Sequence, residues 1–221
     1  MPYRRTENVV RRLAAREQAI LDGAAALAAE SGMGAVQFAS VAERAGIAAG
    51  TVYRYFPSKT DLVAALIESA GERELAALRE AADRAPGPLS ALAAWITTFA
   101  ARALHARHLV WAITGEPIEP DLDRLRRDFR RTLSADLAAR IQSAAAGRHL
   151  PEQDANLAAP AILGALMEGL IGPLAATSFD EVAARDAVQN AALLALRALG
   201  VVDARARGLV AQCAVPVQQA S

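Results

Sequence analysis

The stretch GIAAGTVYRYFPSKTDL, residues 46–62, differs in composition from the rest of the chain. Two glycines, three aromatic residues, a proline and the only lysine of the chain, Lys59, fall within these seventeen residues. The surrounding sequence is mostly alanine, leucine and arginine in patterns typical of helices. The stretch therefore raises the question of what requires a turn of small residues, an aromatic segment and a cation so close together.

The composition predicts an all-α protein of the cytoplasm. Its 221 residues suffice for one or two domains with a hydrophobic core. Runs of β-branched residues with alternating polarity are absent, so we expect no sheet. Cys213 is the only cysteine, so no internal disulfide forms, which fits a reducing compartment. We find neither a signal peptide nor an uncharged membrane span, and we expect a soluble, cytoplasmic protein with no membrane contact.

The charge is balanced overall but is uneven along the chain. Twenty-four basic and 24 acidic residues give a net charge of zero, which argues against a nonspecific polycation. Residues 1–60 carry eight basic and five acidic side chains, a net charge of +3. The N-terminal part is therefore the candidate for contact with an anionic partner.

Hydrophobic periodicity and turn residues predict nine helices. We expect them over about 10–30, 37–45, 49–55, 58–84, 89–106, 108–114, 121–146, 152–176 and 180–199. Residues 1–11 are polar and basic, and we expect them to be mobile, while the tail after Val202 has weak periodicity and is expected to fray. Pro86-Gly87-Pro88 is the clearest break.

The two short helices on either side of Gly46 predict a helix-turn-helix. Glycine supplies the unusual backbone angle of the turn, and Ala42 is small where the helices cross. Ser58 is a good N-cap for the helix after Pro57, with Asp61 three residues later. The outward positions of the second helix would enter a DNA major groove while neighbouring groups contact phosphates.

The segment VAERAGIAAGTVYRYFPSKTDL, residues 41–62, resembles the DNA-binding signature of the TetR (tetracycline-repressor) family of bacterial transcriptional regulators. Gly50-Thr51-Val52-Tyr53, Tyr55-Phe56 and Ser58-Lys59 match its most specific steps, and the detailed match covers about residues 13–67. The resemblance implies a helix-turn-helix DNA-binding domain over 1–57, a helical ligand-binding and dimerisation domain over 58–202, and a tail over 203–221.

The resemblance also implies the DNA contacts. Thr51 and Tyr53 match positions that contact phosphates or base edges, Tyr55 one near the DNA backbone, and Lys59 the lysine that meets a phosphate beside a helix N-terminus. Arg54 stands at a variable position, where its fork can read guanine. The candidate DNA-binding residues are Gln37, Ala48, Ala49, Thr51, Tyr53, Arg54, Tyr55 and Lys59.

Some positions depart from the family pattern, and some have a simpler interpretation. The family often has threonine or serine where Val36 and Gln37 stand, and serine where Ala48 stands. The reading surface therefore offers few hydrogen-bonding groups besides Arg54 and Thr51. Core packing alone explains Phe56, whereas for Tyr53 and Tyr55 we expect a packed ring with its hydroxyl toward phosphate. Further phosphate or minor-groove contacts are expected from Arg4, Arg5, Arg11 and Arg12.

The rest of the chain is compatible with ligand sensing and dimerisation. Aromatic and polar residues of the middle helices are the candidate ligand contacts, which suit an apolar or aromatic effector: Trp95, Phe99, His105, His108, Trp111, Phe129 and Met167. The last two predicted helices, 152–176 and 180–199, carry apolar faces and small residues that predict a four-helix dimer interface. The alternative is that both sets only fill the core within one chain.

The sequence as a whole favours a homodimeric repressor that a small molecule releases from a palindromic operator. A helical enzyme is the first alternative, but no phosphate loop, zinc spacing or nucleophile–base pair occurs. A DNA-binding module that signals through a protein partner is the second. We expect no cofactor and no metal, since His105, His108 and Glu116 form only a weak ligand set.

Overall fold

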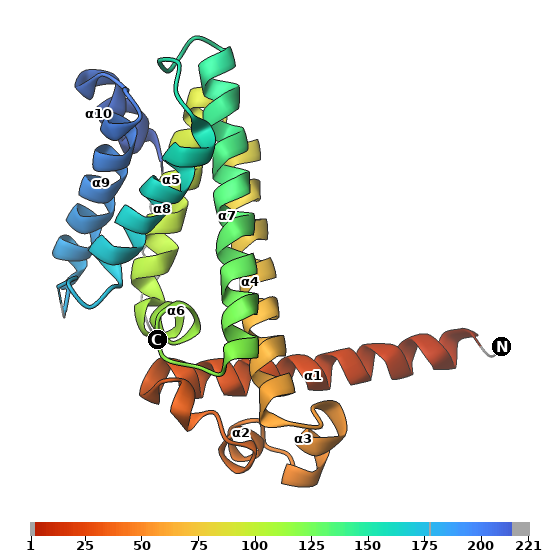
Figure 1. Ribbon diagram of the computed structural model, residues 1–221. Helices are drawn as coiled ribbons and strands as arrows, with labels where there is room; N and C mark the ends of the chain where they lie inside the picture. The colour runs from red at the N-terminus through yellow and green to blue at the C-terminus, as the bar shows by residue number, and fades with distance from the viewer. Residues whose placement is uncertain (1–2, 177, 214–221) are drawn as a thin grey trace. The chain divides into compact units, whose positions relative to one another are not determined.

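The computed structural model describes residues 3–176 and 178–213, and within them it contains α-helices, one 3-10 helix and no strand. The all-α prediction is confirmed. The elements are α1 (Tyr3–Ser31), η1 (Met33–Ala35), α2 (Phe38–Arg44), α3 (Ala49–Tyr55), α4 (Lys59–Asp83), α5 (Pro88–His105), α6 (Arg107–Thr114), α7 (Pro120–Ala146), α8 (Ala155–Leu170), α9 (Glu181–Ala198) and α10 (Asp203–Gln212), labelled in Figure 1.

The described chain forms two compact units. Unit 1 takes the chain up to Ala70 together with His108–Arg126, and unit 2 takes Gly71–Arg107 and the chain from Arg127 onward. Helices α4 and α7 each contribute to both units. The predicted boundary between residues 57 and 58 divides a DNA-binding domain from a ligand-binding and dimerisation domain. It is a division by function and stays a prediction.

The core of unit 1 forms where α1, α2, α3 and the first turns of α4 meet. Apolar residues at helical spacing on each element are fully or almost fully buried: Ile20, Ala24, Ala28, Val41, Ala42, Val52, Phe56, Leu62 and Leu66. Because residues far apart in sequence share this core, burial of apolar area stabilises the two short helices, which are too short to be stable alone.

Helix α1 begins earlier than the periodicity predicts. We expected residues 1–11 to be mobile, but the helix starts at Tyr3. Its described side chains from Asn8 to Gln18 are all exposed, including Val9 and Leu13, so no buried stripe marks this part of the helix. Arginine, glutamate and alanine favour helix without any packing partner, which a search for apolar periodicity misses.

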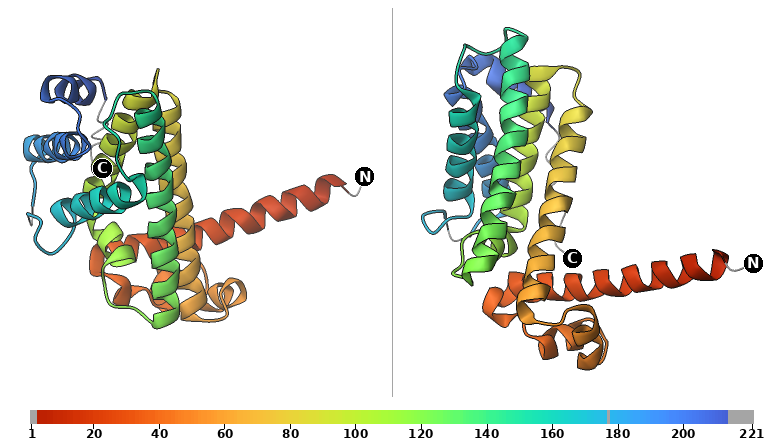
Figure 2. Two further views of the ribbon diagram at one scale, coloured as in Figure 1. Left: turned by 45° about the horizontal axis from the view of Figure 1, so that its top comes forward. Right: turned by 45° about the vertical axis from the view of Figure 1, so that its right-hand side comes forward.

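In unit 2, α4 and α7 run side by side in the same direction, as both views of Figure 2 show. Ion pairs join Arg79 to Asp136 at 2.7 Å and Arg140 to Asp83 at 2.9 Å. The buried faces of the unit 2 helices include large, fully buried core residues such as Leu92, Trp95, Ile96, Leu137, Ile141 and Leu196.

Two predictions at the C-terminal end of unit 2 were wrong. Helix α8 ends at Leu170 rather than near residue 176, because Gly172 and Pro173 follow and proline cannot continue a helix. The tail does not fray as far as it is described, since Asp203–Gln212 form α10, with Ala206 and Val210 buried. Hydrogen bonds from Arg207 and Arg197 lower the pKa of Asp203 in its first turn. Residues 214–221 of the predicted tail lie outside the described chain.

No helix among the described residues is both long and apolar enough to cross a membrane.

Candidate nucleic-acid interface

The turn between α2 and α3 is a Schellman motif. Gly46 has φ of 64°, its amide donates to the carbonyl of Glu43, and the amide of Ile47 donates to the carbonyl of Ala42 at 2.9 Å. The left-handed backbone at Gly46 explains why this position requires glycine. The motif ends α2 and redirects the chain so that α3 packs across it.

Helix α3 separates its inward and outward residues cleanly. Val52 is fully buried, whereas Ala48, Ala49, Tyr53 and Arg54 are exposed. Tyr53 is 59% exposed, yet its ring packs edge-on against Phe38 of α2, with centroids 4.4 Å apart. The tyrosine is therefore held in place while its outer edge stays accessible.

The N-terminus of α4 presents a cation beside a capped helix end. Ser58 and Asp61 form a capping box: the amide of Ser58 donates to the Asp61 carboxylate at 3.0 Å, and the amide of Asp61 donates to Ser58 Oγ at 3.1 Å. The predicted N-cap is confirmed. Lys59 follows at the first helical position and is exposed. A helix N-terminus with a neighbouring ammonium group suits a phosphate.

The remaining predicted DNA contacts differ in their exposure to solvent. Thr51 and Tyr55 are half-buried, and Tyr55 packs against the core of unit 1. Gln37 is exposed, but its amide donates to the carbonyl of Gly34 at 3.0 Å, so it helps to hold the turn before α2. Arg11 and Arg12 are exposed on α1; the side chains of Arg4 and Arg5 lie outside the described ones.

A bidentate ion pair joins the helices that support this surface. Arg44 at the end of α2 donates to both carboxylate oxygens of Glu30 on α1, at 2.7 and 2.5 Å. The same hydrogen bond lowers the pKa of Glu30 and raises that of Arg44. Both side chains are exposed, so the pair orients α2 more than it stabilises the fold.

The loop after α6 contacts both sides of the helix-turn-helix, which the sequence did not reveal. The amide of Met33 donates to the Glu116 carboxylate at 2.7 Å, and the Thr60 hydroxyl donates to the Glu119 carboxylate at 2.8 Å. Buried Arg126 donates to the carbonyls of Ala112, at 2.7 Å, and Glu116, and its burial lowers its pKa. The loop thus fixes the turn before α2 and the start of α4.

The predicted ligand contacts are divided between the two units. His108 and Trp111 belong to unit 1, and the other five belong to unit 2. Trp95 and Phe99 are buried and stacked, and the Trp95 indole donates to Asp136 at 2.9 Å. His105 is exposed, whereas Phe129 and Met167 are half-buried. A ligand that reached Trp95 would have to displace packed side chains.

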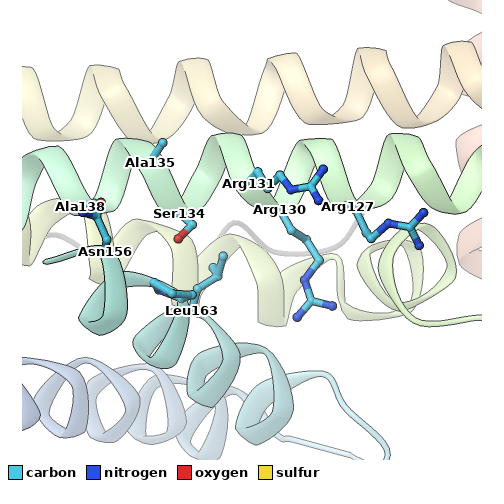
Figure 3. Close-up of a pocket in the computed structure, with 9 residues that line it drawn as sticks. Arg127, Arg130, Arg131, Ser134, Ala135, Ala138, Asn156 and Leu163 are labelled. Carbon is cyan, nitrogen blue, oxygen red and sulfur yellow. The ribbon is translucent and has the colours of Figure 1, made fainter. Parts of the chain in front are cut away.

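Unit 2 contains a hollow elsewhere, between α7 and α8 (Figure 3). Its volume is about 500 Å³. None of the predicted ligand contacts is among its lining residues, which are Arg127, Arg130, Arg131, Ser134, Ala135, Ala138, Asn156, Pro160 and Leu163. Arg127, Arg130 and Arg131 belong to a run of charged residues on α7, and all three are exposed. The spacing of three and four residues in this run is the same for a solvated face and for the wall of a site.

The sequence that forms the surface around α3 matches a known family. The profile "Bacterial regulatory proteins, tetR family" matches residues 20–66, which include α2, α3 and the start of α4. The HTH-type transcriptional regulator BetI of Serratia proteamaculans (strain 568) is 31% identical over 163 residues, 70% of this chain and 78% of that protein. The chain belongs to the TetR family.

Other TetR-family relatives match more closely over a shorter segment. The HTH-type transcriptional repressor KstR of Rhodococcus jostii (strain RHA1) is 50% identical over 58 residues, 26% of this chain. The match spans only 27% of that repressor's length. The likeness to KstR is therefore confined to about a quarter of either chain.

Solved structures share the fold of this TetR-family chain. RolR in complex with resorcinol has a TM-score of 0.63 at 23% identity, covering 96% of this chain and 100% of RolR. The fatty acid degradation regulator FadR from Bacillus halodurans has a TM-score of 0.71 at 22% identity, covering 85% of this chain and 97% of FadR. At these identities the likeness concerns the fold.

Proposed function

We propose that this TetR-family protein is a sequence-specific DNA-binding repressor that acts as a homodimer and leaves its operator when a small molecule binds its helical domain. One observation carries the proposal: α3 and its N-cap Ala48 expose Ala48, Ala49, Tyr53 and Arg54 while Val52 is buried, and exposed Lys59 follows at the α4 N-terminus. A rigidly held short helix with a phosphate site beside it suits a major groove.

The outward residues divide into two roles. Lys59 and the hydroxyl of Thr51 contact phosphates, which supplies affinity for any sequence. Arg54 contacts base edges, with guanine as its preferred partner, and the methyl groups of Ala48 and Ala49 contact thymine methyl groups. Because few hydrogen-bonding groups are available, Arg54 carries most of the base discrimination.

Helices α8 and α9 supply the dimer interface in this proposal. They pack against each other and leave large apolar side chains in solvent: Leu157 is 70% exposed, Val182 66% and Leu194 59%. A side chain added at Gly164 or Gly169 of α8 would meet no atom within 4 Å, so a second helix has room to approach closely. Two such faces related by a two-fold axis form a four-helix bundle.

Release by an effector follows from linkage. In one form of the dimer, the reading helices do not match successive major grooves. A small molecule that binds this form better lowers the protein's affinity for DNA, and DNA lowers the protein's affinity for the small molecule by the same factor. RolR, which shares the fold, was solved with resorcinol, and KstR and BetI are named as transcriptional regulators, which supports regulation rather than catalysis. The effector's release of DNA is part of the proposal.

Binding of labelled duplexes at several salt concentrations tests the DNA contacts. We expect Lys59→Ala to weaken binding to operator and random DNA alike and to reduce the slope of log K against log salt by about 1. We expect Arg54→Ala to cost about 1–3 kcal/mol on the operator and much less on random DNA. Arg84→Ala, at an exposed arginine of unit 2, is the charge-matched control. Equal losses on both duplexes for Arg54→Ala would contradict the readout role.

A further inference from the structure

The hollow between α7 and α8 is built from one face of each helix. On α7 the lining residues follow steps of three and one from Arg127 to Ala138, and on α8 Asn156, Pro160 and Leu163 follow steps of four and three. Both series repeat at helical spacing, so each helix contributes one face to the hollow. At 1.5 Å per residue, the α7 wall is about 16 Å long.

The charge on this wall lies at one end. Figure 3 shows Arg127 and Arg130 on one side of the hollow and Ala138 and Asn156 on the other. None of the nine lining residues is acidic. Neighbouring Asp128 pairs with Arg131 at 2.7 Å and offsets its charge, and Arg127 also takes part in an interaction, so Arg130 is the arginine that carries the argument. The cationic end is therefore suited to a carboxylate or phosphate, which guanidinium groups bind through paired hydrogen bonds.

The other end of the hollow is mainly apolar. Ala135, Ala138, Pro160 and Leu163 form its walls, and Ser134 and Asn156 supply hydrogen-bonding groups. The volume of about 500 Å³ falls in the range of sites for small organic ligands. A molecule with an anionic group and an apolar body fits this arrangement at both ends, whereas an inorganic anion would leave the apolar walls unused.

We propose that this hollow is a binding site for an organic anion that joins a carboxylate or phosphate to an apolar body. The anionic group lies at Arg130, and the apolar body lies along Ala135 and Ala138. The binding site is argued without reference to DNA. Only the further step, that this anion is the effector that releases DNA, rests on the proposed function. This anion differs from the apolar or aromatic effector that the aromatic residues of the sequence suggested.

Calorimetric titration of the full-length protein without DNA tests the site. The probes are octanoate and octyl phosphate, with 1-octanol as the neutral match and inorganic phosphate as the anion without an apolar body. We expect at least one amphiphilic anion to bind about tenfold or more tightly than either control probe. The stronger of the two anions identifies the carboxylate or the phosphate as the natural group.

Three variants locate the binding. Arg130→Gln removes the charge at the site and is expected to weaken the anion about tenfold. Arg124→Gln makes the same change at an exposed position of α7 that does not line the hollow, and is expected to leave affinity unchanged. Ala135→Leu keeps every charge but fills the apolar end, and is expected to weaken the amphiphile while leaving the far-UV circular dichroism unchanged.

The proposal is overturned if 1-octanol or inorganic phosphate binds as tightly as the amphiphilic anions. It is also overturned if Arg124→Gln weakens binding as much as Arg130→Gln, since the effect would then be general charge, or if no probe binds. These results are independent of DNA. A protein that binds octanoate at Arg130 but ignores every operator would instead contradict the proposed function and leave the site in place.

Discussion

Glu116 joins the loop after α6 to the turn that precedes the helix-turn-helix, and Glu116→Ala tests how much this contact contributes. The Glu116 carboxylate accepts from the amide of buried Met33 at 2.7 Å. It also covers Gly32, where an added Cβ would lie 2.8 Å from Oε1. Removing the carboxylate leaves the Met33 amide without this partner.

The expected cost follows from the kind of hydrogen bond. A partly buried bond to a charged group contributes about 1.5–3 kcal/mol, so we expect Glu116→Ala to lower the free energy of unfolding by about 2 kcal/mol. For a chain of this length, that corresponds to a fall in Tm of about 4–8 °C. Glu116→Gln keeps an acceptor but loses its charge, so we expect it to cost about 1 kcal/mol.

Urea denaturation followed by circular dichroism measures the difference. Glu119→Ala is the matched control, because Glu119 lies in the same loop and accepts one hydrogen bond, from Thr60 at 2.8 Å, but is exposed. We expect this control to cost about 0.5 kcal/mol. If Glu116→Ala costs no more than Glu119→Ala, the loop does not hold the turn as we describe.

Two further predictions concern the helix-turn-helix glycines and a buried carboxylate. Gly46→Ala should lower the free energy of unfolding in urea by about 1–2 kcal/mol, because φ is 64° there although an added Cβ would meet no atom. Gly50→Ala in α3 should leave the free energy of unfolding unchanged and weaken only DNA binding. Equal losses of stability in the two variants would refute the argument from backbone angle. Burial raises the pKa of Glu74 above its ordinary 4.5 despite its ion pair with Arg102, so the native state keeps this proton to higher pH than the unfolded state. Stability should therefore fall as pH rises from about 4.5 through the folded pKa, and Glu74→Gln should remove that dependence; parallel curves of unfolding free energy against pH would contradict it.

Local signals allowed the helix-turn-helix to be predicted from sequence almost to the residue. Gly46 marked the turn, Ser58 and Asp61 marked the next helix start, and α3 has the predicted bounds of Ala49–Tyr55. Each signal acts through hydrogen bonds between residues a few positions apart, so the sequence contains both partners.

Features that depend on distant partners were not predictable in the same way. The Glu116–Met33 contact joins residues 83 positions apart, and nothing near either residue indicates the other. The aromatic residues Trp95 and Phe99 had the composition of a ligand site, but they pack into the core of unit 2. The hollow on α7 was not predictable either, because the sequence does not show which helix lies opposite this face.

The central claim, that a dimer of this protein reads DNA through α3, is tested most directly by footprinting on genomic fragments selected by the purified protein. We predict protection of a two-fold symmetric site with half-sites one helical turn, about 10–10.5 base pairs, or a multiple of it apart. Arg54→Ala should lose this site, and Arg84→Ala should retain it. Fragments without a shared motif, or a single unrepeated half-site bound by the wild-type protein, would contradict the claim.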